Sequence, residues 1–496
     1  MTTPRPTWAQ WLLAAGLLLS SLAYLPAAET NGPRNGEWDR SLVTLEVARN
    51  QFDYTQPWVR KPRRLKKTGL VVEGREILTK ADQLQDRTMI RLQKGGRGRW
   101  WIGEIAWIDY HANLALLKVT EADFWKDLKP VEWGKGVPED GSLQILRWRE
   151  GTLENRRAEF SRFIVKESPL SPLSRAVLEC SSEIQNAGWG EPVVAGSRVT
   201  GVLSGQDGRT CVALPASFIR TVLTARQNGS YKGFGYFHFY WQQAENPALL
   251  ASLKLPGEPR GVVVDLVPRR PDGAEQTIRP KDIILKIDGF SLDIQGDYTD
   301  PEFGDVMLEN LPSRGKWAGE EMKLEIWRDG KAMDITYRLP KYDYTNSMVP
   351  VASHDQEPEY LVVGGLLFQP LTSSFLQSWG AEWKRRSPFR LFYYTEQQPT
   401  PERPALVMLS QVMPDPYNIG YQDQRYLVVD KVNGQSISRL ADLQQALQKP
   451  VDGYHIIDFV RSDSLNRMVI AAGDAEAQAT ARVVKRYGIT KPSVIR

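Results

Sequence analysis

Short apolar runs separated by turn residues dominate the chain between residues 41 and 222. Several are rich in β-branched and aromatic residues, among them 42–47, 69–72, 88–92 and 100–105. Runs of this kind, bounded by turn formers, predict β-strands. Many short strands at this spacing indicate barrels or sandwiches, and the pattern alone does not choose between them. One helix is expected at 217–225, followed by a linker at 227–230.

Two further units follow, each with a hydrophobic strand that runs into a tight turn. In the first, the run 278–287 precedes Asp288-Gly289; in the second, Val432 precedes Asn433-Gly434. Both dipeptides favour two-residue hairpin turns. The region 319–339 has the pattern of closing strands for the first of these units. The two units form a weak internal repeat, and 496 residues leave room for about three domains.

Composition narrows the class of protein only slightly. The chain is 42% hydrophobic and 25% charged, with a formal net charge of +4, which is typical of a globular protein and offers no bulk argument for binding nucleic acid. The run 60–67 is locally basic. We interpret it as a solvated loop entering a strand, with contact to an anionic surface as the alternative.

The N-terminal residues have the order of a secretion signal. Arg5 supplies a positive start, Trp11 to Leu19 form a short apolar core, and Pro26-Ala27-Ala28 offers small residues for cleavage. The sequence therefore predicts a signal peptide over 1–28, a linker over 29–40, and a periplasmic or secreted protein. An uncleaved anchor is the alternative, and no later stretch is expected to span a membrane.

Three stretches carry the argument about chemistry: 76–84 (EILTKADQL), 113–119 (NLALLKV) and 186–194 (NAGWGEPVV). Their order and spacing resemble the base, acid and nucleophile segments of trypsin-like serine proteases of the Deg/HtrA branch. On that resemblance Asp82 stands for the base, Asn113 for the acid and Trp189 for the nucleophile. The glycine turn that would hold the oxyanion keeps Gly188 and Gly190 but has Glu191 in place of a glycine.

The resemblance implies a mainly β fold, with a trypsin-like double β-barrel over 41–230, and a pseudoprotease rather than an enzyme. The runs at 278–289, 364–372, 407–412 and 432–437 resemble the two PDZ-like domains of plant-type Deg proteases. They imply a first PDZ-like domain over 231–342, a linker over 343–358, and a second PDZ-like domain with a C-terminal extension over 359–496.

PDZ domains add an extended peptide to a sheet edge and hold its carboxylate with a glycine loop. The matching positions are Tyr236, Phe237, His238, Phe239 and, in the second unit, Gly365, Leu366, Leu367, Phe368. Both loops depart from the pattern, and His238 replaces the usual glycine. We therefore expect weak dependence on a free C-terminus, with plain core packing of these residues as the alternative.

The remaining reactive residues are few. His111 offers a displaced dyad with Ser181 or Ser182, although a loop histidine without such a role is the simpler interpretation. Cys180 and Cys211 map to strands that pair in the resembled fold, which implies a disulfide; two buried free thiols are the alternative. No residue spacing indicates a metal, and no cofactor is expected.

Taken together, the sequence predicts an exported, catalytically inactive Deg-like protein. Its expected partners are unfolded or extended polypeptide segments, and it is expected to form a homo-oligomer or to scaffold an envelope assembly. Two alternatives are a serine endopeptidase acting through a non-standard site and a purely structural, self-assembling protein.

Overall fold

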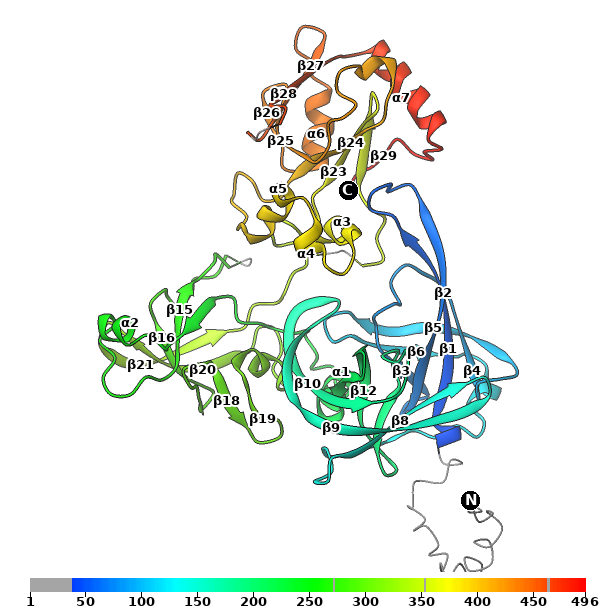
Figure 1. Ribbon diagram of the computed structural model, residues 1–496, viewed down its shortest axis with the longest axis vertical. Coiled ribbons are helices and arrows are strands. Elements are labelled where there is room, and N and C mark those ends of the chain that lie inside the picture. Colours follow the sequence, from blue (N-terminus) through cyan, green and yellow to red (C-terminus); the bar gives the residue numbers. More distant parts are fainter. Residues whose placement is uncertain (1–37, 271–272, 352–353, 462–463) are drawn as a thin grey trace, which may run out of the picture.

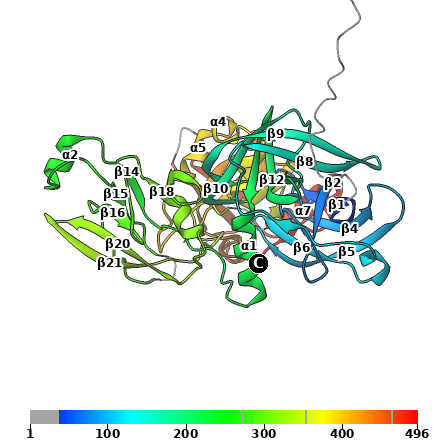
Figure 2. The same ribbon diagram turned by 90° about the horizontal axis from the view of Figure 1, so that it is seen from below.

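The computed structural model describes residues 38–270, 273–351, 354–461 and 464–496. The predicted signal peptide at 1–28 lies outside these residues. Two β-barrels occupy the lower right of Figure 1, a second unit lies to their left, and a third unit lies above them. Seen from below, the second unit extends sideways from the barrels (Figure 2).

The first barrel is closed, with the strand order β1-β2-β3-β6-β5-β4. Its interior is filled by alternate apolar residues of these strands, including Val43, Leu45 and Leu117. Its elements are η1 (Trp38–Arg40), β1 (Leu42–Phe52), β2 (Arg60–Val72), β3 (Glu76–Thr79), β4 (Arg87–Lys94), β5 (Trp100–Asp109), β6 (Leu114–Lys118) and η2 (Ala122–Trp125).

The second barrel closes through the pairing of β11 with β12, in the order β11-β8-β9-β10-β13-β12, and β7 joins β12 in parallel. The helix α1 packs Phe218 and Ile219 into a core that both barrels share. The mainly β double barrel expected from the sequence is thus confirmed. Its elements are β7 (Glu132–Trp133), β8 (Ser142–Arg149), β9 (Thr152–Ser168), β10 (Ser171–Ser182), β11 (Pro192–Ala195), β12 (Arg198–Asp207), β13 (Thr210–Pro215) and α1 (Ala216–Gln227).

The basic run 60–67 is a strand, so its interpretation as a solvated loop is wrong. It forms the first part of β2 and pairs residue by residue with β1, from Phe52 opposite Arg60 to Leu42 opposite Leu70. Its cationic side chains up to Lys66 are exposed, whereas Lys67 is buried. The run can be highly charged because its side chains face solvent. It still forms a strand because its backbone is hydrogen-bonded to β1.

The β1–β2 hairpin rises from the first barrel and reaches the third unit (Figure 1). Gln369 donates a hydrogen bond from its Nε2 to the carbonyl of Tyr54 over 2.9 Å. The ring centroids of Trp58 and Tyr360 lie 5.9 Å apart. The hairpin therefore links the barrel to the third unit directly, outside the connecting chain.

The second unit is built on a sheet with the order β14-β15-β16-β20-β21, in which β17 pairs with β16. The expected Asp288-Gly289 turn joins β16 to β17, and both residues have positive φ (48° and 86°). Its elements are β14 (Tyr240–Gln243), α2 (Pro247–Ser252), β15 (Val262–Leu266), β16 (Ile283–Ile287), β17 (Phe290–Ser291), β18 (Asp297–Asp300), β19 (Gly304–Met307), η3 (Leu308–Ser313), β20 (Glu321–Arg328) and β21 (Lys331–Arg338).

The third unit has the strand order β28-β27-β25-β24-β23-β22-β29, with β26 beside β25. A group of short helices is inserted between β23 and β24. Its elements are β22 (Tyr360–Val363), β23 (Leu366–Pro370), α3 (Ser373–Leu376), η4 (Gln377–Trp379), α4 (Trp383–Arg386), α5 (Phe389–Phe392), η5 (Tyr393–Glu396), β24 (Val407–Val412), η6 (Pro416–Asn418), β25 (Leu427–Val432), β26 (Gln435–Ser436), α6 (Leu440–Leu447), β27 (Tyr454–Phe459), β28 (Arg467–Ala471), α7 (Asp474–Arg486) and β29 (Ser493–Val494).

Candidate functional site

The three positions expected to correspond to a catalytic triad meet between the two barrels. Asp82 follows β3, Asn113 precedes β6, and Trp189 lies in the turn before β11. The backbone N–H of Asp82 donates to Oδ1 of Asn113 over 2.8 Å. Asn113 has a φ of 54°, a left-handed conformation that asparagine tolerates. None of the three side chains is a nucleophile or a base of the kind that serine hydrolysis needs.

A lysine that the sequence analysis did not consider connects these positions. The Nζ of Lys80 lies 2.9 Å from Oδ2 of Asp82 and donates to the carbonyl of Ser204 over 3.1 Å. It also lies 5.3 Å from the ring centroid of Trp189. Lys80 is buried, with 3% of its surface exposed. Its place two residues before Asp82, on the same strand end, is the signal that points to this pairing.

A second buried lysine, Lys67, also contacts Asp82. Lys67 donates from Nζ to the backbone carbonyl of Asp82, and burial lowers the pKa of Lys67 well below its ordinary value. Although burial pushes the pKa of Asp82 upward, the ammonium groups of Lys80 and Lys67 hold it below its ordinary value. The position expected to correspond to the base therefore holds a carboxylate that two lysines stabilise in its charged form.

The turn before β11 retains the glycines that its backbone requires. Gly188 and Gly190 both have a φ of 95°. A Cβ on Gly188 would lie 2.9 Å from the Cα of Gly205, and one on Gly190 would lie 2.8 Å from the carbonyl oxygen of Thr68. These positions accept only glycine, because both the space and the φ exclude a side chain.

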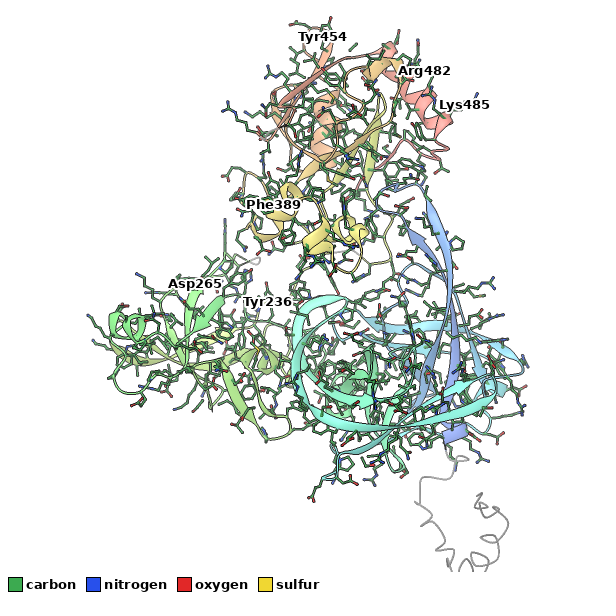
Figure 3. All side chains as sticks on the ribbon, viewed as in Figure 1. Tyr236, Asp265, Phe389, Tyr454, Arg482 and Lys485 are labelled. Carbon is green, nitrogen blue, oxygen red and sulfur yellow. The ribbon has the colours of Figure 1, made fainter. Side chains whose placement is uncertain are left out.

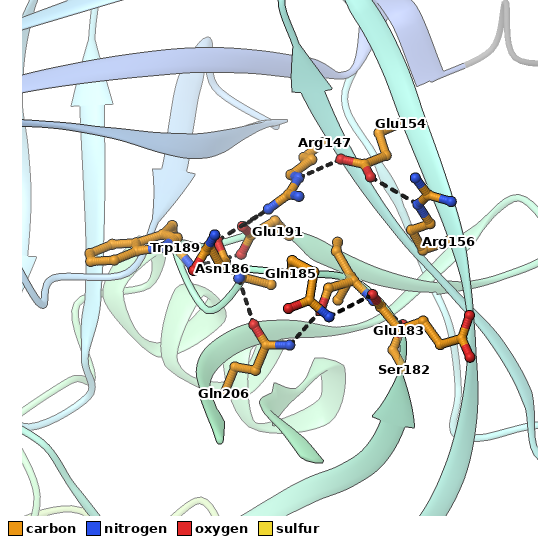
Figure 4. Close-up of polar contacts among 12 residues, drawn as sticks. Arg147, Glu154, Arg156, Ser182, Glu183, Gln185, Asn186, Trp189, Glu191 and Gln206 are labelled. Atoms are coloured by element: carbon orange, nitrogen blue, oxygen red, sulfur yellow. Dashed lines mark hydrogen bonds and ion pairs between the residues drawn. The ribbon is translucent and has the colours of Figure 1, made fainter. Parts of the chain in front are cut away.

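In trypsin-like hydrolases the oxyanion is held by two backbone N–H groups, that of the nucleophile residue and that of the residue two positions before it. Here those groups belong to Trp189 and Ala187, and both are occupied. Oε2 of Glu191 accepts from the N–H of Trp189 over 2.6 Å and from that of Gly188 over 3.0 Å. Oε1 of Gln206 accepts from the N–H of Ala187 over 2.7 Å (Figure 4).

Glu191 is held in this position by its surroundings. Its side chain is 2% exposed, and burial raises the pKa of its carboxyl above the ordinary value. Arg147 approaches Oε1 of Glu191 at 4.0 Å and donates to the carbonyl of Asn186 over 3.1 Å. Arg147 is itself held by Glu154 at 2.8 Å (Figure 4). A carboxylate of the chain thus accepts from the N–H group that the resemblance assigns to an oxyanion site.

The displaced dyad considered for His111 is not formed with either serine that the sequence suggested. Ser182 donates to the carbonyl of Arg157 instead. Nδ1 of His111 lies 2.7 Å from Oγ of Ser171, a serine that the sequence analysis did not consider. The ring stacks on Tyr344 with centroids 4.2 Å apart, and burial lowers the pKa of His111 to about 4.

Cys180 of β10 and Cys211 of β13 lie directly opposite one another in adjacent antiparallel strands. Both are buried free thiols in the structure. Opposite residues of such strands have Cα atoms roughly 4.5–5.5 Å apart, which lies within the span that a disulfide bridges. The hydrogen bond that the Cys180 thiol donates to Cys211, together with burial, raises the pKa of Cys180. The predicted disulfide stays a prediction.

The first predicted peptide loop, 236–239, runs into the edge strand β14. The N–H of His238 donates to the Tyr337 hydroxyl over 2.9 Å, and Nδ1 of His238 lies 2.8 Å from the Tyr236 hydroxyl. A donor that a PDZ loop would present to a carboxylate is therefore already bonded. A cavity of about 150 Å³ adjoins the loop, and Phe237 and Trp241 are among the residues that line it.

The edge of β14 remains open. In the part of the chain that the structure describes, β14 pairs only with β15, from Tyr240 opposite Leu266 to Gln243 opposite Val262. The side chain of Tyr240 is 55% exposed. An unpaired strand edge of this kind is the element to which PDZ domains add a peptide.

The second predicted loop, 365–368, has no such edge. Gly364 and Gly365 form the turn of a hairpin, and β23 pairs with β22 on one side and with β24 on the other. The N–H of Gly364 donates to Oγ1 of Thr480, and its carbonyl accepts from Nδ2 of Asn418 over 2.9 Å. This loop is built into the sheet of the third unit.

The described part of the chain offers neither a metal-binding cluster nor a membrane-spanning helix. Across residues 38–270, 273–351, 354–461 and 464–496, no three His, Cys, Asp or Glu side chains are grouped so that they could hold a metal ion. Within the same ranges no helix is long and apolar enough to cross a membrane.

Comparison with known proteins gives consistent matches. A profile of the PDZ domain family matches residues 349–493. Protease Do-like 4, mitochondrial, of Arabidopsis thaliana is 24% identical over 90% of this chain and 84% of its own length. Protease Do-like 2, chloroplastic, of the same plant is 24% identical over 90% of this chain and 74% of its own length.

Among solved structures, the HtrA-type protease AlgW with a decapeptide gives a TM-score of 0.46 at 16% identity, covering 62% of this chain and 98% of that one. The sequence matches to the Do-like proteases run through the barrels and the units that follow them, and the PDZ profile falls on the third unit. The chain is a homologue of the Deg/HtrA proteases and carries a PDZ domain at its C-terminal end.

Proposed function

We propose that this chain is a catalytically inactive homologue of the Deg/HtrA proteases that binds extended polypeptide segments. The position of Glu191 is the observation that supports catalytic inactivity. Its carboxylate accepts from the N–H of Trp189, and Gln206 accepts from the N–H of Ala187, so both donors expected at an oxyanion site are used within the chain. An anionic intermediate would have to displace an anion that the protein itself supplies.

The three triad positions support the same conclusion. Asp82 is paired with Lys80, Asn113 uses its amide oxygen on the backbone of Asp82, and Trp189 has no nucleophilic atom. The triad acts as a unit, so the loss of any one member leaves only residual catalysis. Here all three are replaced.

The contact between His111 and Ser171 is the one observation that favours a non-standard serine protease. The geometry suits proton transfer, because the two side chains lie 2.7 Å apart and the ring is neutral at neutral pH. Access argues against it: Ser171 is 4% exposed, and its Oγ also accepts from the N–H of Leu173. We therefore assign this pair a structural role.

Peptide binding is assigned to the second unit, along the open edge of β14. The bonded N–H of His238 removes one donor for a terminal carboxylate, so the ligand is an internal or extended segment rather than a chain end. The loop 365–368 of the third unit takes no part, because both edges of β23 are paired.

The test for inactivity uses the purified protein, an unfolded fluorogenic substrate and a fluorophosphonate probe. We expect neither cleavage nor labelling. Labelling that Ser171→Ala abolishes would establish a relocated nucleophile and overturn the proposal. The corresponding Ser182→Ala variant is the matched control.

The test for binding is a proline scan of β14 against a fluorescent extended peptide. Backbone N–H groups of successive residues point to opposite edges of a strand, so proline at Gln242 or Gln243 blocks the open edge in one case and the pairing with β15 in the other. The proline that blocks the open edge leaves the pairing with β15 intact, so that variant should unfold like the wild type but lose peptide binding. Unchanged binding by both variants would leave only the purely structural, self-assembling alternative.

Export and self-association complete the proposal. We infer removal of residues 1–28 and assembly into a homo-oligomer outside the cytoplasm. The names of the two plant relatives place those proteins in mitochondria and chloroplasts. N-terminal sequencing of the protein from its native host tests the processing step, and an intact Met1 in the membrane fraction would contradict it.

A further inference from the structure

An aromatic and cationic segment projects from the third unit at α4, α5 and η5. Phe389 is 78% exposed, the highest value among the large apolar side chains that the described residues expose, and Tyr393 is 49% exposed. The two rings lie 6.3 Å apart. Phe389 lies at the edge of the upper body of the molecule in Figure 3. We call residues 383–394 the aromatic–basic patch.

The patch continues beyond these two rings. Trp383 and Phe392 are in contact, with centroids 6.1 Å apart, and the Nζ of Lys384 lies 5.9 Å from the Trp383 ring. Four exposed cations lie within the same short segment, whereas only two carboxylates lie beside it. The cations are Lys384, Arg385, Arg386 and Arg390, and the carboxylates are Glu382 and Glu396. Glu382 is shared by Arg385 at 2.8 Å and Arg386 at 3.7 Å.

We propose that the aromatic–basic patch docks the protein on an anionic lipid surface. Trp and Tyr side chains favour the level of the lipid headgroups, where the ring enters and its polar edge stays wet, and an exposed Phe enters the boundary with the acyl chains. Lysine and arginine beside them are attracted to anionic headgroups. A peripheral contact of this kind needs no membrane-spanning element and is independent of peptide binding at β14.

Charge favours lipid over a second copy of the chain. In a two-fold symmetric dimer the same patch faces itself, which would bring the cations of both copies together. Contact with an acidic peptide would use the cations but leave Phe389 without a partner of its own kind. A lipid interface satisfies both parts of the patch.

The test is cosedimentation of the purified full chain with vesicles. One set contains phosphatidylcholine only, and the other equal parts phosphatidylcholine and phosphatidylserine. We expect binding to the second set, weakened by salt. Phe389→Ser should lower the partition coefficient about tenfold, and the combined variant Lys384→Gln, Arg385→Gln, Arg386→Gln about a hundredfold.

Matched controls use exposed residues of the same unit. Ile419→Ser removes a side chain that is 72% exposed, and Lys449→Gln, Lys485→Gln, Lys491→Gln removes three exposed cations. Neither should change the partition, and the N-terminus is common to all variants. Equal binding to both vesicle sets, or equal losses in the controls, would overturn the proposal. So would a dimer that Phe389→Ser dissolves, or an acidic peptide that binds the patch while vesicles do not.

Discussion

The carboxylate of Glu191 accepts a hydrogen bond from the backbone N–H of Trp189, at 2.6 Å. The donor belongs to the position where a trypsin-like protease carries its nucleophile, and the acceptor replaces a glycine of the same turn. The turn therefore supplies its own anion. The proposed inactivity would then rest on the occupied backbone donor as well as on the side chains at the three triad positions.

Restoring the triad alone should give little proteolysis. In the variant Asp82→His, Asn113→Asp, Trp189→Ser, Glu191 still occupies the oxyanion donor at position 189. Adding Glu191→Gly should raise the rate, since one such donor contributes about 100-fold to 1000-fold in kcat. Cleavage of an unfolded fluorogenic protein measures both variants. Strong activity without the change at Glu191 would contradict this account of the turn.

The Lys80–Asp82 pair should stabilise the fold measurably. Lys80→Met leaves the half-buried carboxylate of Asp82 without its main partner and should lower the free energy of unfolding by about 3 kcal/mol. Asp82→Asn in the same background should recover part of the loss. Urea unfolding of the two single variants and the double variant gives the coupling energy. A coupling near zero would mean that the pair is solvated.

Stability should fall in acid because of His111. Its pKa is about 4 in the folded protein and about 6.5 in the unfolded chain, so the unfolded chain takes up the proton first as the pH falls. The contribution is present above pH ~6.5 and is lost toward pH ~4. Between pH ~7 and pH ~4.5 the wild type should lose about 2 kcal/mol more than His111→Gln. Equal losses by denaturant titration would show that another group titrates.

Mild oxidation should join Cys180 to Cys211. The two residues face one another across paired strands, and closing a loop of this size contributes on the order of 3 kcal/mol in the chain-entropy treatment. The oxidised protein should unfold at higher denaturant and show no free thiol after denaturation, whereas Cys211→Ser should retain one thiol and gain nothing. Two titratable thiols after oxidation would exclude the bridge.

Peptide affinity should not depend on a free carboxylate. One extended peptide, prepared as the acid and as the amide, should bind equally, because the N–H of His238 is committed to Tyr337. Isothermal titration compares the two forms, with Tyr337→Phe as the variant that frees this donor. A large loss on amidation would mean that the loop captures chain ends in spite of His238.

Much of the fold could be predicted because its signals are local. Strand runs such as 100–105 and turns such as Asp288-Gly289 follow from side-chain pattern and backbone preference. The extension of β2 over 60–67 could not, because a charged run forms a strand only when a partner such as β1 supplies the ladder. That contact is not local in the sequence.

In the candidate site, too, some features could be predicted from local sequence and others could not. Three sequence stretches predict Asp82, Asn113 and Trp189 as the positions of the triad, and these residues lie near one another in the structure, but their assignment stays a prediction. Glu191 was identified as an obstacle to an oxyanion, but its bonds to the turn depend on the direction of one buried side chain. The contacts of Lys67 and Lys80 with Asp82 were not predicted. Both lysines are buried because the barrel closes, and barrel closure cannot be read from the local sequence pattern.

The hairpin of β22 and β23 determines whether a free peptide can compete for the edge of β23. A PDZ domain takes its ligand as an added strand, and in the third unit β22 already lies beside β23, joined to it by only two residues. A strand on so short a tether acts at an effective concentration of about the millimolar range. A free peptide would have to displace β22, which β29 also holds from its other side, so we expect the third unit to add no strand at this edge of β23.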